Sequence, residues 1–261
     1  MAYGALGRTG IYPIQDVLRL LRLTTKESVP AARALLRNLP RSNWLRLNPI
    51  LEDFETISDT EFADRFLNPR DRAFSVRDLG RLFGDAGFGL RAFLPPIFYE
   101  PRAILSDRDF RDRAGELPAV EQWHLAEQLQ GSLYKHTFYA IKSSDPLQGR
   151  IDFADPDYRA IVRGPNHRYL ANAFAGQAGK RISIAFQRDS KHHSMGLELS
   201  ELEIKVLGRL NDGENFGEIR TAFQSNILPQ VNAAIQRVCE ALLSVGALYL
   251  EVSQVNRGSI G

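Results

Sequence analysis

The stretch that decides the fold is "MAYGALGRTGIYPIQDVLRLLRL", residues 1–23. Gly4, Gly7 and Gly10 follow a very short apolar run, and glycine supplies the positive φ or the close backbone approach that a tight turn needs. Pro13 suits the first turn of a helix. The apolar residues that then recur at helical spacing are Ile14, Val17, Leu18 and Leu21. The stretch therefore predicts a short strand, a glycine-rich turn and an amphipathic helix.

The composition is that of an ordinary folded chain. Its 261 residues are 44% hydrophobic and 25% charged, with a net charge of +2. This length and hydrophobic content are enough for one large core or two small ones. Arginines alternate with acidic residues in "NPRDRAFSVRD" (68–78), a pattern typical of a solvated, self-paired surface rather than a nucleic-acid track. We therefore expect Asp71, between Arg70 and Arg72, to belong to a surface ion network.

Cysteine usage and hydropathy indicate a compartment. Cys239 is the single cysteine, so the sequence can form neither an internal disulfide nor a cysteine zinc site, and a reducing compartment is expected. No apolar run approaches the roughly 18 residues that span a bilayer, and the N-terminus lacks the pattern of a signal peptide. These features predict a cytoplasmic protein with no membrane partner.

The first 142 residues alternate helix and strand patterns, as in α/β folds. Helices are predicted over 30–39, from a cap at Asp59, from a cap at Ser75 to a C-cap at Gly87, and over 107–115 and 117–130. In the last of these, Leu125 and Leu129 give an apolar face. Strands are predicted for "FGLRAFL" (88–94) and "KHTFYAIK" (135–142).

The rest of the chain has a different pattern. Residues 143–180 begin with many turn formers and are predicted to be a linker. Residues 181–261 read as a strand over 181–187, two short helices around the Asn211–Asp212–Gly213 turn, a helix from Pro229 that ends at Gly246, and a strand "ALYLEV". Ser200 and Glu203 have the spacing of a capping box. Three helices followed by a strand suggest a small winged-helix-like module over 181–261.

No set of residues amounts to a catalytic or metal site by itself. "GDAGFG" (84–89) follows a helix, the reverse of the dinucleotide fingerprint, and is a helix end. His192 and His193 fall in a polar loop and, as sequence neighbours, are poorly placed to share one metal. His124 is expected at a helix boundary and His136 in a structural hydrogen bond. No metal is predicted.

Four blocks together resemble, in order, the second half of a bacterial group of class I S-adenosylmethionine-dependent methyltransferases. They are "YGALGRTGIYPIQDVLRLL" (3–21), "LPRSNWLRLNP" (39–49), "FLNPRDRAFSVRDLGRLFGDAGF" (66–88) and "GSLYKHTFYAIK" (131–142). The resemblance implies that 1–142 is the C-terminal part of such a domain with a helical insertion. The family sheet is doubly wound, seven-stranded and mostly parallel, and its glycine-rich cofactor turn follows the first strand. The blocks match only what lies after the fourth strand, so the resemblance implies a partial sheet whose N-terminal, cofactor-binding half is missing.

The resemblance also implies a site. It places Tyr3, Arg8, Thr9 and Tyr12 at the rim of the acceptor pocket, with Arg8 either holding an acidic acceptor or ordering the loop. The alternative is that Arg8 and Tyr12 only brace the turn against the next helix. The family cofactor is S-adenosylmethionine, which this chain alone is expected to bind poorly, and the catalytic residues and the acceptor stay undetermined.

Three functions follow from these observations. The first is the acceptor-side part of a methyltransferase, completed by a separate N-terminal half or by self-association through exposed sheet and helices. The second is a non-enzymatic module for protein interaction or dimerisation. The third is DNA binding through the C-terminal module, which is disfavoured because Arg237 is the only cation of "PQVNAAIQRVCEALLS" (229–244).

Overall fold

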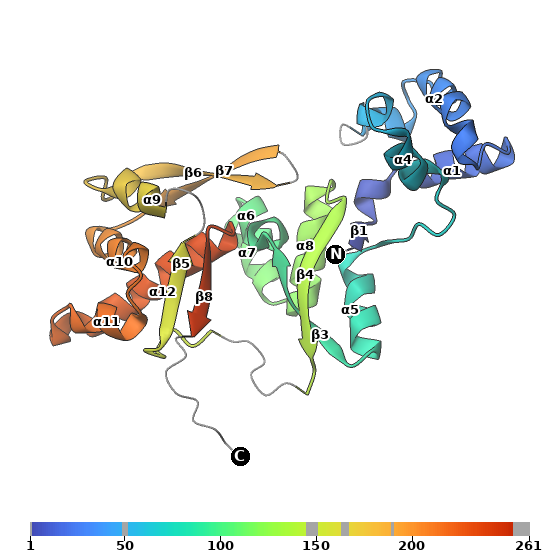
Figure 1. The fold of residues 1–261 in the computed structure, drawn as a ribbon. Coiled ribbons are helices and arrows are strands. Elements are labelled where there is room, and N and C mark those ends of the chain that lie inside the picture. The colour runs from blue at the N-terminus through green and yellow to red at the C-terminus, as the bar shows by residue number, and fades with distance from the viewer. Residues whose placement is uncertain (1, 49–51, 145–150, 163–166, 189–190, 253–261) are drawn as a thin grey trace, which may run out of the picture. The chain divides into compact units, whose positions relative to one another are not determined.

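The computed structural model describes residues 2–48, 52–144, 151–162, 167–188 and 191–252. The chain forms two compact units. The first comprises Met1–Phe93 and Phe98–Asp145, and the second comprises Leu94–Ile97 and Pro146–Gly261. Each unit is a mixture of helices and short strands, and the first contains a small mixed sheet (Figure 1). The predicted α/β class is confirmed at this level.

The sheet of the first unit has the order β2-β1-β4-β3. Its strands are β1 (Ala2–Gly4), β2 (Ala73–Phe74), β3 (Phe88–Leu94) and β4 (Lys135–Lys142). β1 runs parallel to β2, with Tyr3 opposite Ala73, and antiparallel to β4, with Ala2 opposite His136. Because parallel neighbours cannot be joined by a hairpin, a long connection must link β1 to β2. Helices supply it.

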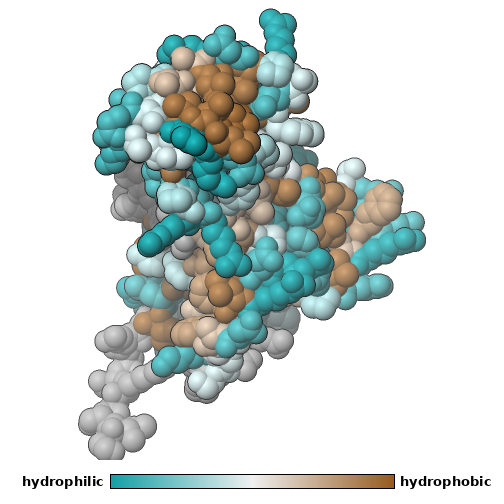
Figure 2. Space-filling model, turned by 90° about the vertical axis from the view of Figure 1, so that its right-hand side faces the viewer, coloured by the Kyte–Doolittle hydropathy of each residue, from teal (hydrophilic) through white to brown (hydrophobic). Residues whose placement is uncertain are grey.

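The connection from β1 to β2 has its own hydrophobic core. It contains α1 (Ile11–Leu20), α2 (Val29–Arg37), α3 (Trp44–Leu47), α4 (Asp59–Phe62) and a π-helix (Ala63–Leu67). The fully buried apolar residues of this core are Ile11, Ile14, Leu18, Val29, Ala32, Leu36, Leu45, Phe62 and Phe66. Figure 2 shows that hydrophobic surface also gathers on the outside of this helical part. Leu21, expected on the buried face of α1, is 54% exposed.

Four helices accompany the sheet. They are α5 (Val76–Asp85), α6 (Pro101–Ile104), α7 (Arg108–Gly115) and α8 (Ala119–Gln130). Ser75 caps α5 as predicted, in a capping box with Asp78, and Gly87 follows the C-cap residue Ala86 with a φ of 79°. The cap of α4 is Ser58 rather than Asp59, because the Ser58 hydroxyl accepts the amide N–H of Glu61.

One face of α8 differs from the prediction. Leu129 is 41% exposed, whereas Ala126 and Glu127 are buried. A carboxylate can take the inward position because its oxygens meet the Val76 amide N–H and the rings of His124 and His136. A pattern that counts only apolar residues cannot anticipate this.

The second unit contains four helices and four strands in the described residues. The strands are β5 (Tyr158–Val162), β6 (Arg181–Arg188), β7 (Lys191–Glu198) and β8 (Leu248–Val252), and the helices are α9 (His167–Phe174), α10 (Glu201–Asn211), α11 (Phe216–Thr221) and α12 (Leu228–Ser244). β5 pairs with β8, and β6 pairs with β7, both antiparallel. Ser200 and Glu203 form the predicted capping box.

The structure departs from the sequence prediction at two places in this unit. Residues 143–180, predicted to be a linker, contain β5 and α9, because β5 finds its hydrogen-bonding partner in β8, far away in the sequence. His192 and His193, predicted in a loop, lie in β7, where they pair with Gln187 and Phe186 of β6. Residues 145–150 and 163–166 of the predicted linker lie outside the described residues.

No helix in the described ranges combines the length and the apolar character needed to cross a membrane.

Candidate functional site

The candidate site is the glycine-rich turn after β1 together with the segment 64–74 that passes beside it. A side chain at Gly4 would overlap the Leu133 carbonyl, and a side chain at Gly7 would overlap the backbone of Tyr134. Gly10 has a φ of 93° and lies against the backbone of Trp44 and Leu45. The glycines are thus needed for close packing on the start of β4 and on α3, and they fix the course of the turn.

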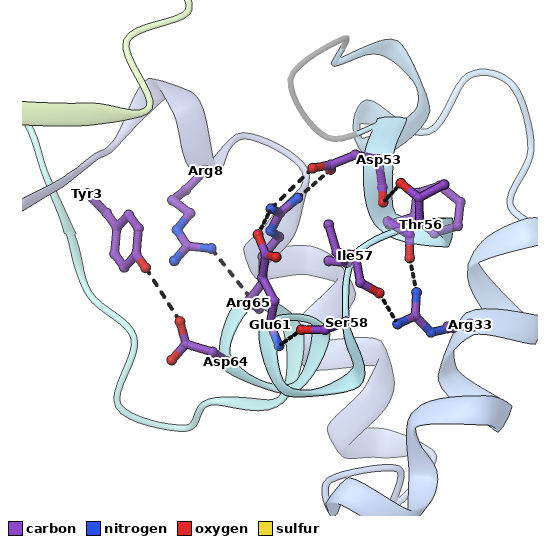
Figure 3. Close-up of polar contacts among 11 residues, drawn as sticks. Tyr3, Arg8, Arg33, Asp53, Thr56, Ile57, Ser58, Glu61, Asp64 and Arg65 are labelled. Atoms are coloured by element: carbon purple, nitrogen blue, oxygen red, sulfur yellow. Dashed lines mark hydrogen bonds and ion pairs between the residues drawn. The ribbon is translucent and has the colours of Figure 1, made fainter. Parts of the chain in front are cut away.

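Arg8 links the turn to the segment 64–74. Its Nη2 lies 3.1 Å from Asp71 Oδ2, and the side chains of Arg8 and Asp71 are only 5% and 2% exposed. Arg8 Nη1 donates to the Arg65 carbonyl at 3.4 Å (Figure 3). The guanidinium also lies over the ring of Tyr3, 4.0 Å from its centroid. The ion pair joins two positions 63 residues apart.

The π-helix provides the acceptor for these contacts. Residues near the end of a helix have carbonyl groups with no partner inside the helix, so side chains can take them. The Arg65 carbonyl accepts both Arg8 and Gln15, whose Nε2 lies 3.2 Å away. Gln15 Nε2 also lies 3.4 Å from Asp71 Oδ2. α1, the turn and the π-helix therefore meet at one buried polar cluster, which we call the Arg8–Asp71 cluster.

Tyr3 and Tyr12 make further contacts across the same boundary. The Tyr3 hydroxyl donates to Asp64 at 3.5 Å, as Figure 3 shows. The Tyr12 hydroxyl accepts the amide N–H of Ala73 at 2.5 Å. The rings remain accessible, with Tyr3 39% and Tyr12 36% exposed, and Thr9 is exposed beside them. The three side chains are open to solvent, whereas Arg8 is not.

A second set of ionic contacts orders the π-helix from the other side. Arg65 Nη1 lies 2.6 Å from Asp53, and Arg65 Nη2 lies 3.0 Å from Glu61 (Figure 3). Arg33 of α2 donates to the carbonyl groups of Phe54 and Ile57, which lie in the stretch between Asp53 and Glu61. These contacts surround the helical core and leave the segment 64–74 in a defined position beside the turn.

Burial changes the acidity of two groups in the site. Burial raises the pKa of Asp71, while the charge of Arg8 and the hydrogen bond from Gln15 oppose the rise. Burial likewise raises the pKa of Tyr12, against the hydrogen bond from Ala73. A raised tyrosine pKa keeps the Tyr12 hydroxyl neutral at neutral pH, and the Asp71 carboxylate is engaged by Arg8 and Gln15.

The site brings together all four predicted residues but gives them different roles. The side chains of Tyr3, Thr9 and Tyr12 are accessible to a ligand at the surface. Arg8 instead forms an ion pair with Asp71 and orders the turn. Arg8 braces the turn against the segment 65–71 rather than against the next helix. Asp71, predicted on the surface, is buried. Its partner is the distant Arg8 and not one of its arginine neighbours in sequence.

A second cluster of buried polar side chains lies next to Gly4. Glu127 Oε1 lies 3.2 Å from His136 Nε2, and His136 Nδ1 lies 2.8 Å from the Tyr99 hydroxyl. His124 Nδ1 lies 3.0 Å from Glu127 Oε2, with a side chain that is 17% exposed, as predicted for a boundary residue. Burial raises the pKa of Glu127, but the hydrogen bonds from His136, the Val76 amide and His124 together lower it. His136 has the predicted structural role.

The described residues contain no group of three or more histidine, cysteine, aspartate or glutamate side chains that could hold a metal ion. No family model matches the sequence.

Proposed function

We propose that the chain is the acceptor-side, C-terminal part of a class I S-adenosylmethionine-dependent methyltransferase. The observation that carries the proposal is the Arg8–Asp71 cluster. It joins the "GRTG" turn to the "PRDRAF" segment, two of the blocks on which the resemblance rests, although 63 residues separate them in sequence. Methyl transfer requires aligned partners more than an acid–base set, and an ordered rim suits it.

The strand pairing of the sheet also supports the proposal. A doubly wound sheet that is mostly parallel contains parallel neighbours with helical connections, and β1 and β2 are such a pair. β4, the last strand of the resemblance, is antiparallel to β1. The helical insertion that the resemblance implies falls between β1 and β2, where the structure has α1 to α4 and the π-helix.

The proposal assigns the methyl donor to another polypeptide segment. The sequence contains no glycine-rich strand–turn–helix fingerprint of the kind that holds a nucleoside in such folds. In this proposal Tyr3, Thr9 and Tyr12 form the rim that meets the acceptor, and Arg8 orders the rim.

Calorimetric titration of S-adenosylmethionine tests the proposal in two arms. The first arm contains this chain alone, and the second contains the chain with the polypeptide encoded in frame directly upstream of its first codon. We expect no binding at micromolar concentrations in the first arm and binding in the second. Micromolar affinity of the chain alone, or no binding and no transfer of a labelled methyl group in the mixture, would overturn it.

The C-terminal part is proposed to be a winged-helix-like module. The succession α10, α11, α12, β8 supports this, with β5 as the partner strand of β8. Its long helix α12 buries Val231, Ile235, Val238 and Leu242 in the core of the unit. Arg237 pairs with Glu203 at 3.1 Å, so the one cation of this helix is already engaged and gives DNA binding no support.

A second candidate function is a non-enzymatic interaction module. The helical part of the first unit exposes large apolar side chains, namely Leu20 at 83%, Leu21 at 54%, Trp44 at 64% and Leu47 at 57%. Apolar surface of this kind commonly marks a protein contact. Light scattering after size exclusion tests this candidate, because the interaction module predicts a concentration-dependent increase in mass that Leu20→Glu reduces.

A further inference from the structure

A pocket of about 270 Å³ lies between α1, the loop that follows it and the end of the π-helix. Its apolar lining comes from Leu18, Leu23, Phe66, Leu67 and Pro69. Phe66 and Leu67 lie in the π-helix, and single π-helical turns inside proteins occur frequently at functional sites. A leucine- and phenylalanine-lined cavity of about 150 Å³ admits benzene, so this pocket has room for an aromatic ring with a small substituent.

One buried polar side chain, Gln15, also lines the pocket. It is only 5% exposed. Its Nε2 points to the Arg65 carbonyl and the Asp71 carboxylate, at 3.2 and 3.4 Å. Both partners are acceptors, which fixes the amide with the NH₂ group toward the Arg8–Asp71 cluster. Gln15 Oε1 takes no hydrogen bond from the described residues, so it is available as an acceptor for a ligand in the pocket that Gln15 lines.

The charges around the pocket indicate an uncharged ligand. Arg19 is the only ionisable side chain in the lining, and it pairs with Asp16 at 2.7 Å. The remaining lining residues of the mouth, Thr24 and Asn68, are neutral. Burying an unpaired charge in such a site would cost far more than a neutral hydroxyl, which needs one hydrogen bond.

We propose that this pocket binds a small uncharged aromatic alcohol, with its ring against Leu18, Leu23 and Phe66 and its hydroxyl donating to Gln15 Oε1. The binding claim is independent of methyl transfer. Gln15 connects the pocket to the Arg8–Asp71 cluster through its contact with Asp71.

The test compares 4-ethylphenol with 1-ethyl-4-fluorobenzene, which has almost the same shape and no donor. The full chain is titrated without S-adenosylmethionine, and ligand-observed NMR of this titration gives both dissociation constants. We expect about five-fold tighter binding of the phenol, the effect of about one hydrogen bond. In Gln15→Met the two ligands should bind equally. Equal binding to the wild type would overturn the assigned hydrogen bond.

Two pocket variants locate the site. Leu23→Trp fills the pocket from its half-buried lining, and Thr24→Trp covers it from an exposed position where folding is not at risk. Both should reduce binding of either ligand at least ten-fold. Leu82→Trp, at an exposed position of α5, is the matched control and should bind like the wild type. Wild-type binding by Thr24→Trp, or no binding by the wild type at millimolar ligand, would overturn the site. Methyl transfer is absent from this assay, so its outcome is separate from that of the proposed function.

Discussion

Arg8 Nη2 and Asp71 Oδ2 lie 3.1 Å apart, and both side chains are almost completely removed from solvent. Removing one member of a buried pair leaves the other charge uncompensated, which costs about 3–5 kcal/mol, whereas replacing both by apolar residues is often neutral. We therefore expect Arg8→Met to lower the free energy of unfolding of the first unit by about 3 kcal/mol. Arg8→Met/Asp71→Leu should recover most of the loss.

Urea unfolding followed by tryptophan fluorescence measures this effect. The two tryptophans of the chain, Trp44 and Trp123, both lie in the first unit, so the signal reports on that unit. In Arg8→Met the loss should shrink as the pH falls, because Asp71, whose pKa burial already raises, then becomes neutral. A double variant as unstable as the single one would contradict a role confined to pairing.

Two glycine substitutions separate a steric requirement from helix propensity. Gly7→Ala places a methyl group into the backbone of Tyr134, and we expect a destabilisation of about 2 kcal/mol from the forced shift of β4. Gly84→Ala is the matched control. It lies in α5, its added methyl group meets no atom within 4 Å, and it should stabilise the unit by about 0.5–1 kcal/mol. The same fluorescence measurement applies, and a neutral Gly7→Ala would show that the turn does not pack on β4 as described.

Glu127 predicts a dependence of stability on pH. Its pKa in the folded state lies below the ordinary value of 4.5, so its stabilising effect is complete above that pH and is lost as the pH falls through the folded pKa. Glu127→Gln should cost about 2 kcal/mol at pH 7, since it weakens hydrogen bonds to a charged acceptor. The difference from the wild type should narrow below pH 4.5. A constant difference from pH 7 to pH 4 would show that the carboxylate is not the stabilising species.

The sequence predicts the elements of this protein better than it predicts their contacts. The strands "FGLRAFL" and "KHTFYAIK" and the caps Ser75 and Ser200 are local features, written in consecutive residues, and the structure has them where the sequence places them. Asp71 is different. Its neighbours Arg70 and Arg72 suggest a surface network, and only the return of the chain to the turn after β1 shows that Arg8 is its partner.

The same limit applies to the other missed features. Glu127 is buried because Val76 and His136 from two other elements, and His124 from its own helix, reach it, and β5 is a strand because β8 provides its ladder. No motif marks Gln15, whose position is set by its hydrogen bond to the Arg65 carbonyl in the π-helix. The contact of Gln15 with Arg65, that of Glu127 with Val76 and the pairing of β5 with β8 each span more than 35 residues, whereas the contacts of Glu127 with His124 and His136 are closer in sequence.

Cys239 allows the unfolding of the second unit to be followed separately. The thiol is buried in α12, and burial raises its pKa to about 12, so almost no thiolate is present at pH 8 and the native protein should resist alkylation. Unfolding exposes the thiol and restores its ordinary reactivity. Pulsed labelling with iodoacetamide along a urea series, read by mass spectrometry, therefore gives a midpoint for the second unit, while tryptophan fluorescence gives one for the first.

Because each unit has its own hydrophobic core, we expect Arg8→Met to shift the fluorescence midpoint and to leave the labelling midpoint unchanged. Equal shifts of both midpoints would show that the two units unfold as one.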